Sequence, residues 1–271
     1  MESNRNRISI LGTGWLGLPL GKHLKDLGYD VKGSTTSPEK ILKLKEFGIQ
    51  PYLIEIDEKG VGENGAGLFD TDILIITIPP ARNLERYKII IQAITNQIQE
   101  KDIKKVLYTS STGVYGNTAG MVDETTVLNP RGISAEGVIF AERAFQALNT
   151  DLTIVRFAGL AGENRNPGRF FAGRKDGTGG NAPVNFVHQT DCILIMAQII
   201  KDNHWNEIFN ICADTHPPKH LFYPFKAKEG SFDVPTFAQD NKKASDYKTI
   251  SNAKIKAALN YEFKYPNPME F

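Results

Sequence analysis

The chain has 271 residues, a formal net charge of +1 and 41% hydrophobic residues, which is typical of a globular protein. The near-zero charge argues against nucleic-acid binding, because that binding rests on an excess of cations that neutralise phosphates. No apolar run reaches the roughly 20 residues of a membrane span, and the N-terminus has no signal-peptide pattern. Two cysteines make no disulfide framework, so we expect a cytoplasmic chain without nucleic-acid or membrane partners.

Strand and helix patterns alternate along the first 157 residues. Apolar and β-branched runs predict strands at 8–11, 29–33, 50–56, 73–78, 106–110 and 152–157. Apolar residues at helical spacing predict helices at 16–27, 38–47, 82–100 and 133–148, while 60–67 is predicted to be a loop. Such alternation is typical of an α/β protein with a doubly wound, Rossmann-type parallel sheet.

The texture of the sequence changes after residue 157. Residues 159–184 are rich in glycine, asparagine and arginine and show little periodicity. Short strands are predicted at 185–188 and 208–212 around a helix over 191–201, and a last helix over 250–259. We therefore expect a main domain over 1–157 and a small second portion over 158–271, of which about 184–213 returns to the main core.

The stretch GTGWLG follows a predicted strand and opens a helix. Gly12 allows a tight turn, Gly14 lets the backbone approach a pyrophosphate, and Gly17 lets the helix pack closely on the strand. The helix N-terminus offers N–H groups and a partial positive charge to phosphates. The alternative is a plain strand-to-helix turn with incidental glycines. We favour a dinucleotide cradle, built from Gly12, Thr13, Gly14, Trp15, Leu16 and Gly17.

The second predicted strand bears on the choice between NAD and NADP. NAD-preferring sites often carry an acidic residue about 20 residues after the glycines, where it binds the ribose 2′-hydroxyl. Here Ser34, Thr35 and Thr36 occupy that turn, with Lys40 one helical turn further on. Hydroxyl groups and a cation tolerate a 2′-phosphate better than a carboxylate does, so we expect NADP or NAD, with NADP favoured. A helix start at Ser37 is compatible with either.

Further cofactor contacts are expected where later strands end, because ligands of doubly wound sheets lie across the carboxyl ends of the strands. Asp57 is placed to accept a hydrogen bond from an adenine amino group, although a solvated loop acid explains it equally well. The predicted contacts are Asp57, Ile78, Pro79, Pro80 and Ser110.

Five strings together resemble the extended short-chain dehydrogenase/reductase superfamily, in its NAD-dependent epimerase/dehydratase group. They are GTGWLG, TSSTGVYG at 109–116, NPRGISAEGVIFAER at 129–143, VNFVHQTDC at 184–192 and SNAKIKAAL at 251–259. The glycine spacing and the short C-terminal part are most similar to an atypical subgroup that includes the bacterial YeeZ-like proteins. The resemblance implies NAD(P) binding, oxidoreductase chemistry on a small hydroxylated or nucleotide-linked substrate, and a homodimer paired through helices 82–100 and 133–148.

The chain departs from that family at its catalytic pair. The family uses a Tyr for proton transfer, a Lys four residues later that holds the nicotinamide ribose, and a Ser that positions the substrate. Ser111 matches the Ser, but Arg131 and Ala135 stand at the Tyr and Lys positions. Arg131 is a poor proton acceptor at neutral pH, and Ala135 cannot hold a ribose. Three alternatives stay open. The chain is an enzyme that uses other acid/base groups, or it binds the dinucleotide without catalysis as a sensor or scaffold, or it acts on a nucleotide-linked sugar by a different mechanism.

Candidate catalytic residues are Ser111 and Tyr115, and the wider set adds Glu136, Glu142 and His188. Each has a structural alternative. In the resemblance Tyr115 is a structural residue near the cofactor, His188 fits a structural turn, and both glutamates fit solvated helix faces.

The irregular segment 159–184 lies where the family places part of its substrate pocket. Its arginines suit phosphate or carboxylate groups, because the guanidinium fork matches them bidentately; ordinary surface arginines are the alternative. The stretch 175–180 is glycine-rich and predicts a lid or a loop. The histidines have no metal-site spacing with the cysteines, so we expect no metal. The substrate-side candidates are Arg165, Arg169 and Arg174.

Overall fold

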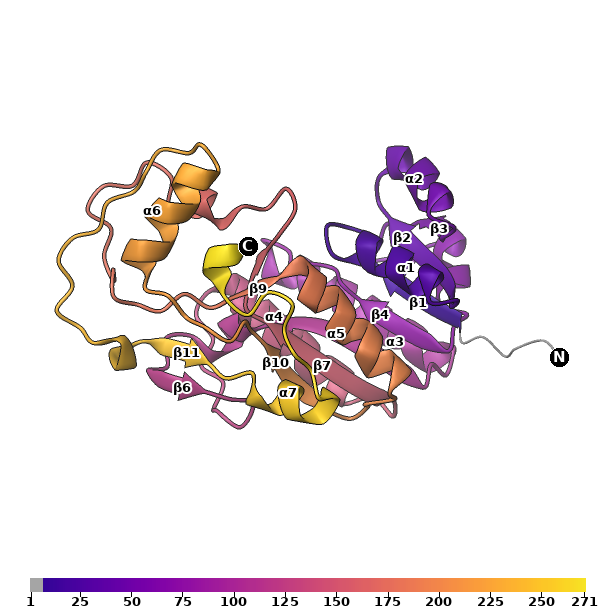
Figure 1. The fold of residues 1–271 in the computed structure, drawn as a ribbon. Coiled ribbons are helices and arrows are strands. Elements are labelled where there is room, and N and C mark those ends of the chain that lie inside the picture. The colour runs from indigo at the N-terminus through magenta and orange to yellow at the C-terminus, as the bar shows by residue number, and fades with distance from the viewer. Residues whose placement is uncertain (1–6) are drawn as a thin grey trace. The chain divides into compact units, whose positions relative to one another are not determined.

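The computed structural model describes residues 7–271, and its central feature is a seven-stranded sheet in the order β10-β7-β5-β4-β1-β2-β3 (Figure 1). Neighbouring strands run parallel, with Ile8 of β1 opposite Val31 of β2 and Ile73 of β4. This confirms the predicted α/β class with a doubly wound, Rossmann-type sheet. The strands are β1 (Arg7–Leu11), β2 (Asp30–Thr35), β3 (Gln50–Leu53), β4 (Ile73–Ile76), β5 (Lys105–Ser111), β7 (Asp151–Phe157) and β10 (Ile208–Ile211).

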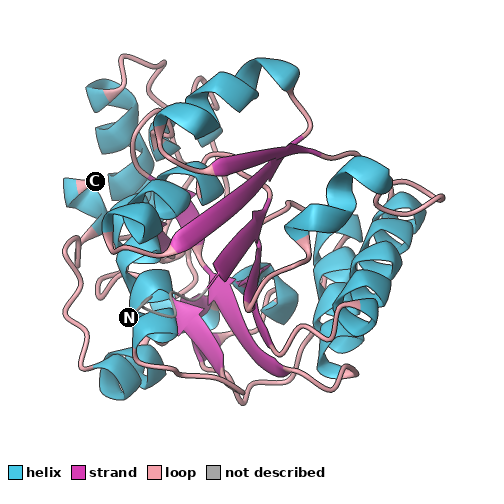
Figure 2. Ribbon diagram, turned by 90° about the vertical axis from the view of Figure 1, so that its right-hand side faces the viewer, coloured by secondary structure: helices cyan, strands magenta, loops and turns pink. Residues whose placement is uncertain are grey.

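Helices flank this sheet (Figure 2). The longest, α3, begins where the Asn83 side chain accepts a hydrogen bond from the Arg86 N–H at 3.0 Å, which satisfies one of the helix's free donors. It buries Tyr87, Ile91 and Ile94 at helical spacing. The helices that follow the strands are α1 (Gly17–Asp26), α2 (Ile41–Glu46), α3 (Leu84–Glu100), α4 (Ile133–Gln146) and α5 (Gln189–Lys201).

The core around β4 and β5 is mainly aliphatic and includes a few buried aromatic rings. All four residues of β4 are buried, as expected for a strand covered on both faces. Tyr108 of β5 and Phe145 of α4 pack with ring centroids 4.9 Å apart. Burying each large side chain of this kind contributes about 1.5–3 kcal/mol. The buried face of α4 therefore fixes that helix against β5.

Several local predictions need correction. The expected strand 50–56 ends at Leu53, the expected helix 38–47 starts as a 3₁₀ turn at Pro38–Lys40, and the expected loop 60–67 contains the 3₁₀ turn Glu63–Leu68. Short glycine-rich windows carry too little periodicity to separate such turns from loops. Three short strands were not anticipated: β6 (Gly120–Val122), β8 (Gly159–Ala161) and β11 (Lys248–Ile250). The strand β9 (Phe186–His188) confirms the short strand expected at 185–188.

The helix α6 (Lys219–Glu229) was also not anticipated. It contains Pro224, which removes a backbone donor and usually breaks a helix. It forms because Phe222, Tyr223 and Ala227 are buried on one face. The expected helix 250–259 is shorter, since Ile250 ends β11 and α7 covers Ala253–Leu259.

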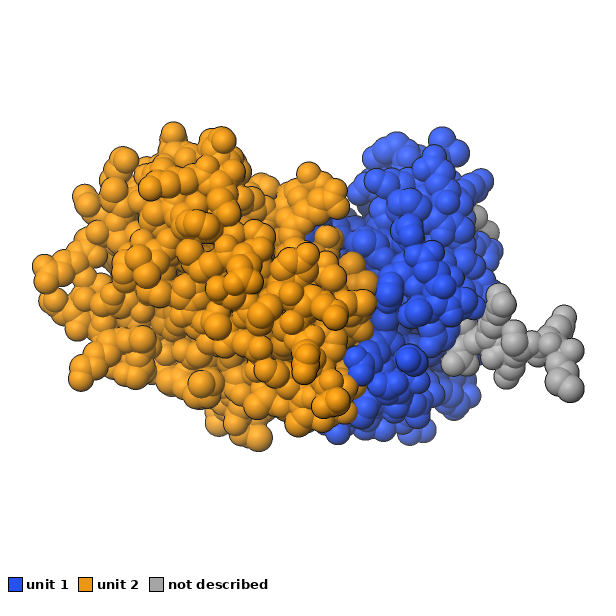
Figure 3. Space-filling view, viewed as in Figure 1, with its two compact units in different colours: residues 1–114, 130–155, 196–208 blue, residues 115–129, 156–195, 209–271 orange. Residues whose placement is uncertain are grey.

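The chain forms two compact units, coloured separately in Figure 3. Unit 1 comprises residues 1–114, 130–155 and 196–208, and unit 2 comprises 115–129, 156–195 and 209–271. Unit 2 has a small core of its own around Phe186, Phe222 and Tyr223. Between residues 7 and 271, no helix combines the length and the apolar character that crossing a bilayer requires. The same residues bring no three potential metal ligands among His, Cys, Asp and Glu together.

Candidate functional site

The glycine stretch lies at the point where the strand order of the sheet reverses. From β1 the chain adds β2 and β3 on one side, and β4 and β5 lie on the other. In open α/β sheets, ligands bind outside the carboxyl ends of the strands at such a point. Gly12 directly follows the carboxyl end of β1, and α1 begins at Gly17. The topology therefore places the predicted cradle where a ligand is expected.

Two glycines of the stretch are required by close contacts. Gly12 has a φ of +106°, and a Cβ added there would lie 3.0 Å from Cγ2 of Ile78. A Cβ on Gly17 would lie only 2.2 Å from the carbonyl oxygen of Gly12. Thr77 fastens the same turn, since its hydroxyl donates to the Gly12 carbonyl at 2.6 Å. These contacts bring the start of α1 directly against the ends of β1 and β4.

Gly14 has the opposite environment. It is exposed, and a Cβ built on it would meet no heavy atom within 4 Å. No side chain caps the N-terminus of α1 at Leu16. An open backbone before a helix N-terminus suits an anion, because the first N–H groups of a helix and its dipole both favour negative charge. The turn therefore has the form that a dinucleotide pyrophosphate needs.

The three hydroxyl residues after β2 have different roles in the structure. Ser34 faces inward: its hydroxyl oxygen accepts from the Gly12 N–H at 2.9 Å, and its carbonyl accepts from the Thr13 N–H at 2.8 Å. Thr35 is also buried, and its hydroxyl oxygen accepts from the Ser37 N–H at 3.1 Å. Thr36 is exposed. Of the three, only Thr36 presents its side chain to solvent.

Gly33 was missed by the sequence reasoning. A Cβ there would lie 2.7 Å from Cγ2 of Thr13 and 2.9 Å from Cγ2 of Ile49, so β2 needs a glycine where the glycine stretch crosses it. The signal was present, because an isolated glycine inside a strand often marks a close backbone approach.

The other predicted cofactor contacts lie beyond β3 and β4. Asp57 is exposed, and one of its carboxylate oxygens accepts from the Lys59 N–H at 2.7 Å, which makes a local turn. Ile78 is half-buried against Gly12. Pro79 is exposed and Pro80 is half-buried. Ile78, Pro79 and Pro80 thus continue the carboxyl edge of the sheet past β4.

The end of β5 holds the two predicted serines. Ser110 is buried, and its hydroxyl donates to a carboxyl oxygen of Glu142 at 2.5 Å. Ser111 is half-buried, and its hydroxyl oxygen accepts from the Gly113 N–H at 3.0 Å. Glu142 was expected on a solvated helix face, but it is 1% exposed on the inner face of α4. Glu136 is exposed, as expected.

Tyr115 is completely buried in unit 2. The Arg156 guanidinium donates to its hydroxyl oxygen at 2.8 Å, and the hydroxyl donates to Oδ1 of Asn210 at 2.8 Å. The Asn210 N–H in turn donates to Glu124 at 2.7 Å. Burial raises the pKa of Tyr115, although Arg156 opposes that shift. These contacts fit a structural hydroxyl better than a proton-transfer group.

The positions that replace the family's Tyr and Lys lie at the start of α4. Arg131 is exposed and precedes the helix, and Ala135 is half-buried in its first turn. Gly132 between them has a φ of +86°, which favours glycine. Neither side chain supplies a base at this point.

His188 in unit 2 is held by its neighbours. Its ring packs on Tyr265 with centroids 3.8 Å apart, and its Nδ1 accepts from the Thr190 N–H at 3.2 Å. Burial lowers the pKa of His188, so the ring is neutral at pH 7 with its proton on Nε2. The buried Asp191 carboxylate fixes the supporting segment by accepting from the Tyr265 N–H at 3.0 Å and the Tyr261 hydroxyl at 2.7 Å.

The three predicted substrate-side arginines all lie in unit 2. Arg165 is half-buried, and burial together with the neighbouring Arg169 lowers the pKa of its guanidinium. Arg169 and Arg174 are exposed. The Arg174 guanidinium lies over the ring of Phe171, 4.7 Å from its centroid.

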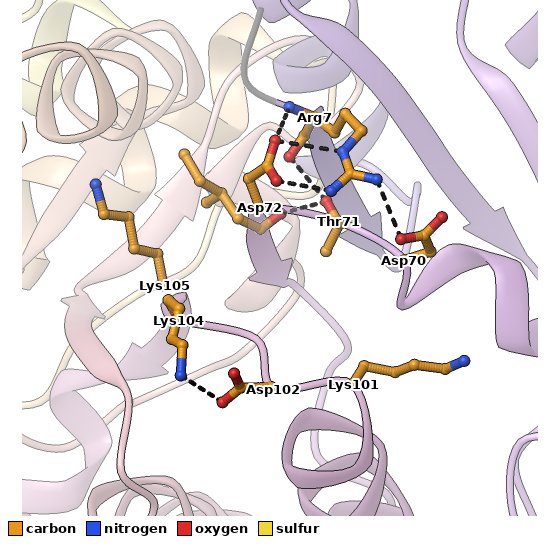
Figure 4. A pocket seen from close by; sticks show the side chains of 9 residues that line it. Arg7, Asp70, Thr71, Asp72, Lys101, Asp102, Lys104 and Lys105 are labelled. Carbon is orange, nitrogen blue, oxygen red and sulfur yellow. Dashed lines mark hydrogen bonds and ion pairs between the residues drawn. The ribbon is translucent and has the colours of Figure 1, made fainter. Parts of the chain in front are cut away.

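A polar pocket of about 340 Å³ lies at the opposite end of the sheet, at the amino ends of β1, β4 and β5 (Figure 4). Some of its charges pair with one another, while Lys101 and Lys105 also line the pocket without a partner, within residues 7–271, among its charged side chains. Arg7 binds Asp72 at 2.8 Å and Asp70 at 3.1 Å, and Lys104 pairs with Asp102. None of the predicted site residues lines this pocket.

Comparison with known proteins places the chain in a family. No protein-family model matches it. The YeeZ protein of Escherichia coli strain K12 is 34% identical over 271 residues, which cover 97% of each chain. The chain belongs to the YeeZ family. The match includes the glycine stretch and both units, since it spans nearly the whole length.

Solved structures show the same fold as this YeeZ-family chain. A functionally unknown conserved protein from Silicibacter pomeroyi has a TM-score of 0.78 at 24% identity, covering 98% of this chain and 96% of its own. The UDP-glucuronic acid 4-epimerase of Bacillus cereus, solved in complex with NAD, has a TM-score of 0.75 at 16% identity, covering 97% and 95%. At these identities the likeness establishes the fold and leaves the activity to the site.

Proposed function

We propose that the chain is an NAD(P)-binding oxidoreductase of the epimerase/dehydratase type that acts on a small hydroxylated or nucleotide-linked substrate. The observation that carries the proposal is the contrast inside the glycine stretch, where Gly12 and Gly17 are tightly packed while Gly14 faces open space before a helix N-terminus. The NAD complex of the Bacillus cereus epimerase, which shares the fold, supports it.

The residues divide the binding task. The backbone around Gly14 and the N-terminus of α1 would hold the pyrophosphate, and Ile78 and Pro79 would border the cofactor past β4. The exposed Thr36 and Lys40 would lie beside the ribose 2′ position, so we favour NADP over NAD. A bound nicotinamide would supply hydride transfer. Ser111 is the residue best placed by its sequence match to orient a substrate hydroxyl.

A non-catalytic NAD(P)-binding sensor or scaffold is the second candidate. It is favoured by one specific observation: the exposed Arg131 and the half-buried Ala135 leave the start of α4 without the family's proton-transfer pair. The buried Tyr115 does not replace that pair, because its hydroxyl already bonds to Arg156 and Asn210.

Both candidates are tested by titrating the purified protein with NADPH and with NADH. Binding is measured by the change in Trp15 fluorescence and by calorimetry. Binding that is lost in Gly14→Asp would support the cradle. Failure of both cofactors to bind at near-millimolar concentration would overturn either candidate. The bound form would then be mixed with UDP-sugars, beginning with UDP-glucuronic acid, and followed by nicotinamide absorbance and product analysis. Turnover would select the enzyme, and binding without turnover would select the sensor.

We also propose that the chain acts in the cytoplasm as a homodimer paired through α3 and α4. Its two cysteines, Cys192 and Cys212, are both buried and unpaired with each other, as suits a reducing compartment. Light scattering on the purified protein measures the mass in solution. A monomer at all concentrations would contradict the dimer.

A further inference from the structure

Three aromatic rings of unit 2 stack beside α6. The Phe171 ring lies 4.1 Å from Tyr223 and 5.7 Å from Phe237 between centroids, and both pairs are stacked. Burial raises the pKa of Tyr223 to about 12, so this phenol is neutral under ordinary conditions. The rings therefore form an aromatic platform without charge of its own.

Two cationic side chains lie close to this aromatic platform. The Arg174 guanidinium lies 4.7 Å from the Phe171 centroid, and the Lys219 ammonium lies 5.8 Å from the same centroid. Within residues 7–271, neither cation forms an ion pair or a hydrogen bond through its side chain. The aromatic ring is thus the feature that gathers the two positive charges.

The Asp240 carboxylate, which attracts Lys219, accepts its hydrogen bonds from other residues. Asp240 attracts Lys219 electrostatically, but one of its oxygens accepts from the Asn181 N–H at 2.9 Å and from the Tyr247 hydroxyl at 2.8 Å. The other accepts from the Lys242 N–H at 3.1 Å. The Asp240 carboxylate therefore holds loops together and does not bond directly to Lys219.

This arrangement is electrostatically costly in the free protein. Lys219 is half-buried, and burial and the positive charge of Arg174 both lower its pKa. Lys219 is also the first residue of α6, where the helix dipole adds partial positive charge. A half-buried cation beside a second cation is unfavourable unless a negative group compensates for it.

We propose that Arg174 and Lys219 form a binding site for the phosphate or carboxylate group of an anionic ligand. The guanidinium supplies a planar fork for two oxygens and the ammonium supplies a compact point charge, and both lie near the Phe171 ring. Lys219 was not among the sequence candidates. The inference rests on the proposed function, because it narrows the substrate class to anionic compounds and disfavours neutral polyols.

The alternative is that the two cations only stabilise the loop through their contacts with Phe171. Calorimetric titration of the full chain with UDP and with inorganic pyrophosphate separates the two. We expect Arg174→Met and Lys219→Met each to weaken binding about tenfold, which corresponds to about 1.4 kcal/mol. Lys219→Arg should retain most of the affinity. Lys228→Met, an exposed lysine later in α6, is the matched control and should bind as the unsubstituted chain does.

The two probes also identify the source of the anion. If UDP binds more tightly than pyrophosphate, the site is assigned to a nucleotide-linked ligand. If pyrophosphate binds as tightly as UDP, the site is assigned to a free phosphate group. NADPH affinity is measured in parallel and should be unchanged in both Met variants, so failure of this site is distinguishable from failure of the cradle. The Arg174 side chain is exposed, so Arg174→Met should fold normally. The proposal would be overturned if UDP and pyrophosphate each bound this variant as tightly as the unsubstituted chain, or if neither probe bound the unsubstituted chain.

Discussion

The two ends of the central sheet in unit 1 use their polar groups differently. At the amino ends of β1, β4 and β5, a pocket of about 340 Å³ is lined by charged side chains, several of which pair with one another, such as Arg7 with Asp72. At the carboxyl ends, the turn is held by partly buried hydrogen bonds, and the exposed feature is the bare backbone at Gly14. The amino end therefore presents ion pairs that are already formed, whereas the carboxyl end presents open backbone.

This difference shows why the presence of a pocket alone does not mark the site. A side chain that already forms an ion pair has part of its charge compensated, so it attracts a ligand less strongly than an unpaired one. A backbone turn before a helix N-terminus offers its donors without such compensation. The carboxyl end is therefore the better candidate, and substitutions at the two ends should differ in what they change.

The largest effect on stability is expected at Gly17, which ends the turn, and Gly14 at its centre provides the contrast. Gly17→Ala would place a Cβ 2.2 Å from the Gly12 carbonyl oxygen and should destabilise folding by about 3 kcal/mol. Gly14→Asp enters open space and should change the free energy of unfolding by no more than about 0.5 kcal/mol. Urea unfolding measures both values.

Cofactor binding sharpens the same comparison. Gly14→Asp places a carboxylate where a pyrophosphate is expected and should weaken NADPH binding by about 3 kcal/mol or more, roughly a hundredfold. Gly14→Ala, which adds a side chain without a charge, is the control. A stable Gly14→Asp protein with unchanged NADPH affinity would show that the carboxyl end is not the cradle.

The next effect concerns Ser110, whose hydroxyl donates to the buried Glu142 at 2.5 Å. Ser110→Ala leaves that carboxyl oxygen without this donor and should destabilise folding by about 2 kcal/mol. If Ser110 is mainly a structural residue, the Kd for NADPH should change by less than about twofold. A large loss of affinity with little loss of stability would instead confirm Ser110 as a cofactor contact, as the sequence suggests.

A third effect tests cofactor preference. Thr36 is exposed while Ser34 and Thr35 are buried, so Thr36→Asp should change the surface beside the ribose without disturbing the turn. Repulsion of the 2′-phosphate should weaken NADPH binding about tenfold relative to NADH. Thr36→Asn keeps the shape without the charge and should leave the ratio near its original value. An unchanged ratio in Thr36→Asp would place the ribose elsewhere.

The sequence was most informative where the signal is local. The glycine spacing predicts the turn at Gly12, Gly14 and Gly17 because the chain itself brings these residues together. The apolar runs predict the sheet for the same reason, since β4 is buried on both faces and is apolar throughout. The five motifs that resemble the family predict in which order the elements of the fold follow one another along the chain.

What the sequence could not predict depends on distant contacts. Ser34 turns inward because Gly12, 22 positions away along the chain, donates to it. Glu142 is buried because α4 presents it to Ser110, 32 positions away. The meeting of Arg174 with Lys219 on Phe171 requires α6, whose Pro224 hides it from any helix pattern. Periodicity reports which face is buried and not which partner it meets.

The smallest effect is expected at the amino end. The Arg7 hydrogen bond lowers the pKa of Asp72 below its usual 3.8, so the pair stabilises folding above that pH and loses its contribution as the pH falls further. Because both side chains are about two-fifths exposed, Asp72→Asn should cost only about 0.5 kcal/mol near neutral pH. This loss should shrink in high salt, and NADPH affinity should not change. A large effect on NADPH binding would mean that the two ends of the sheet are coupled, and that the paired charges of the amino end serve the cofactor after all.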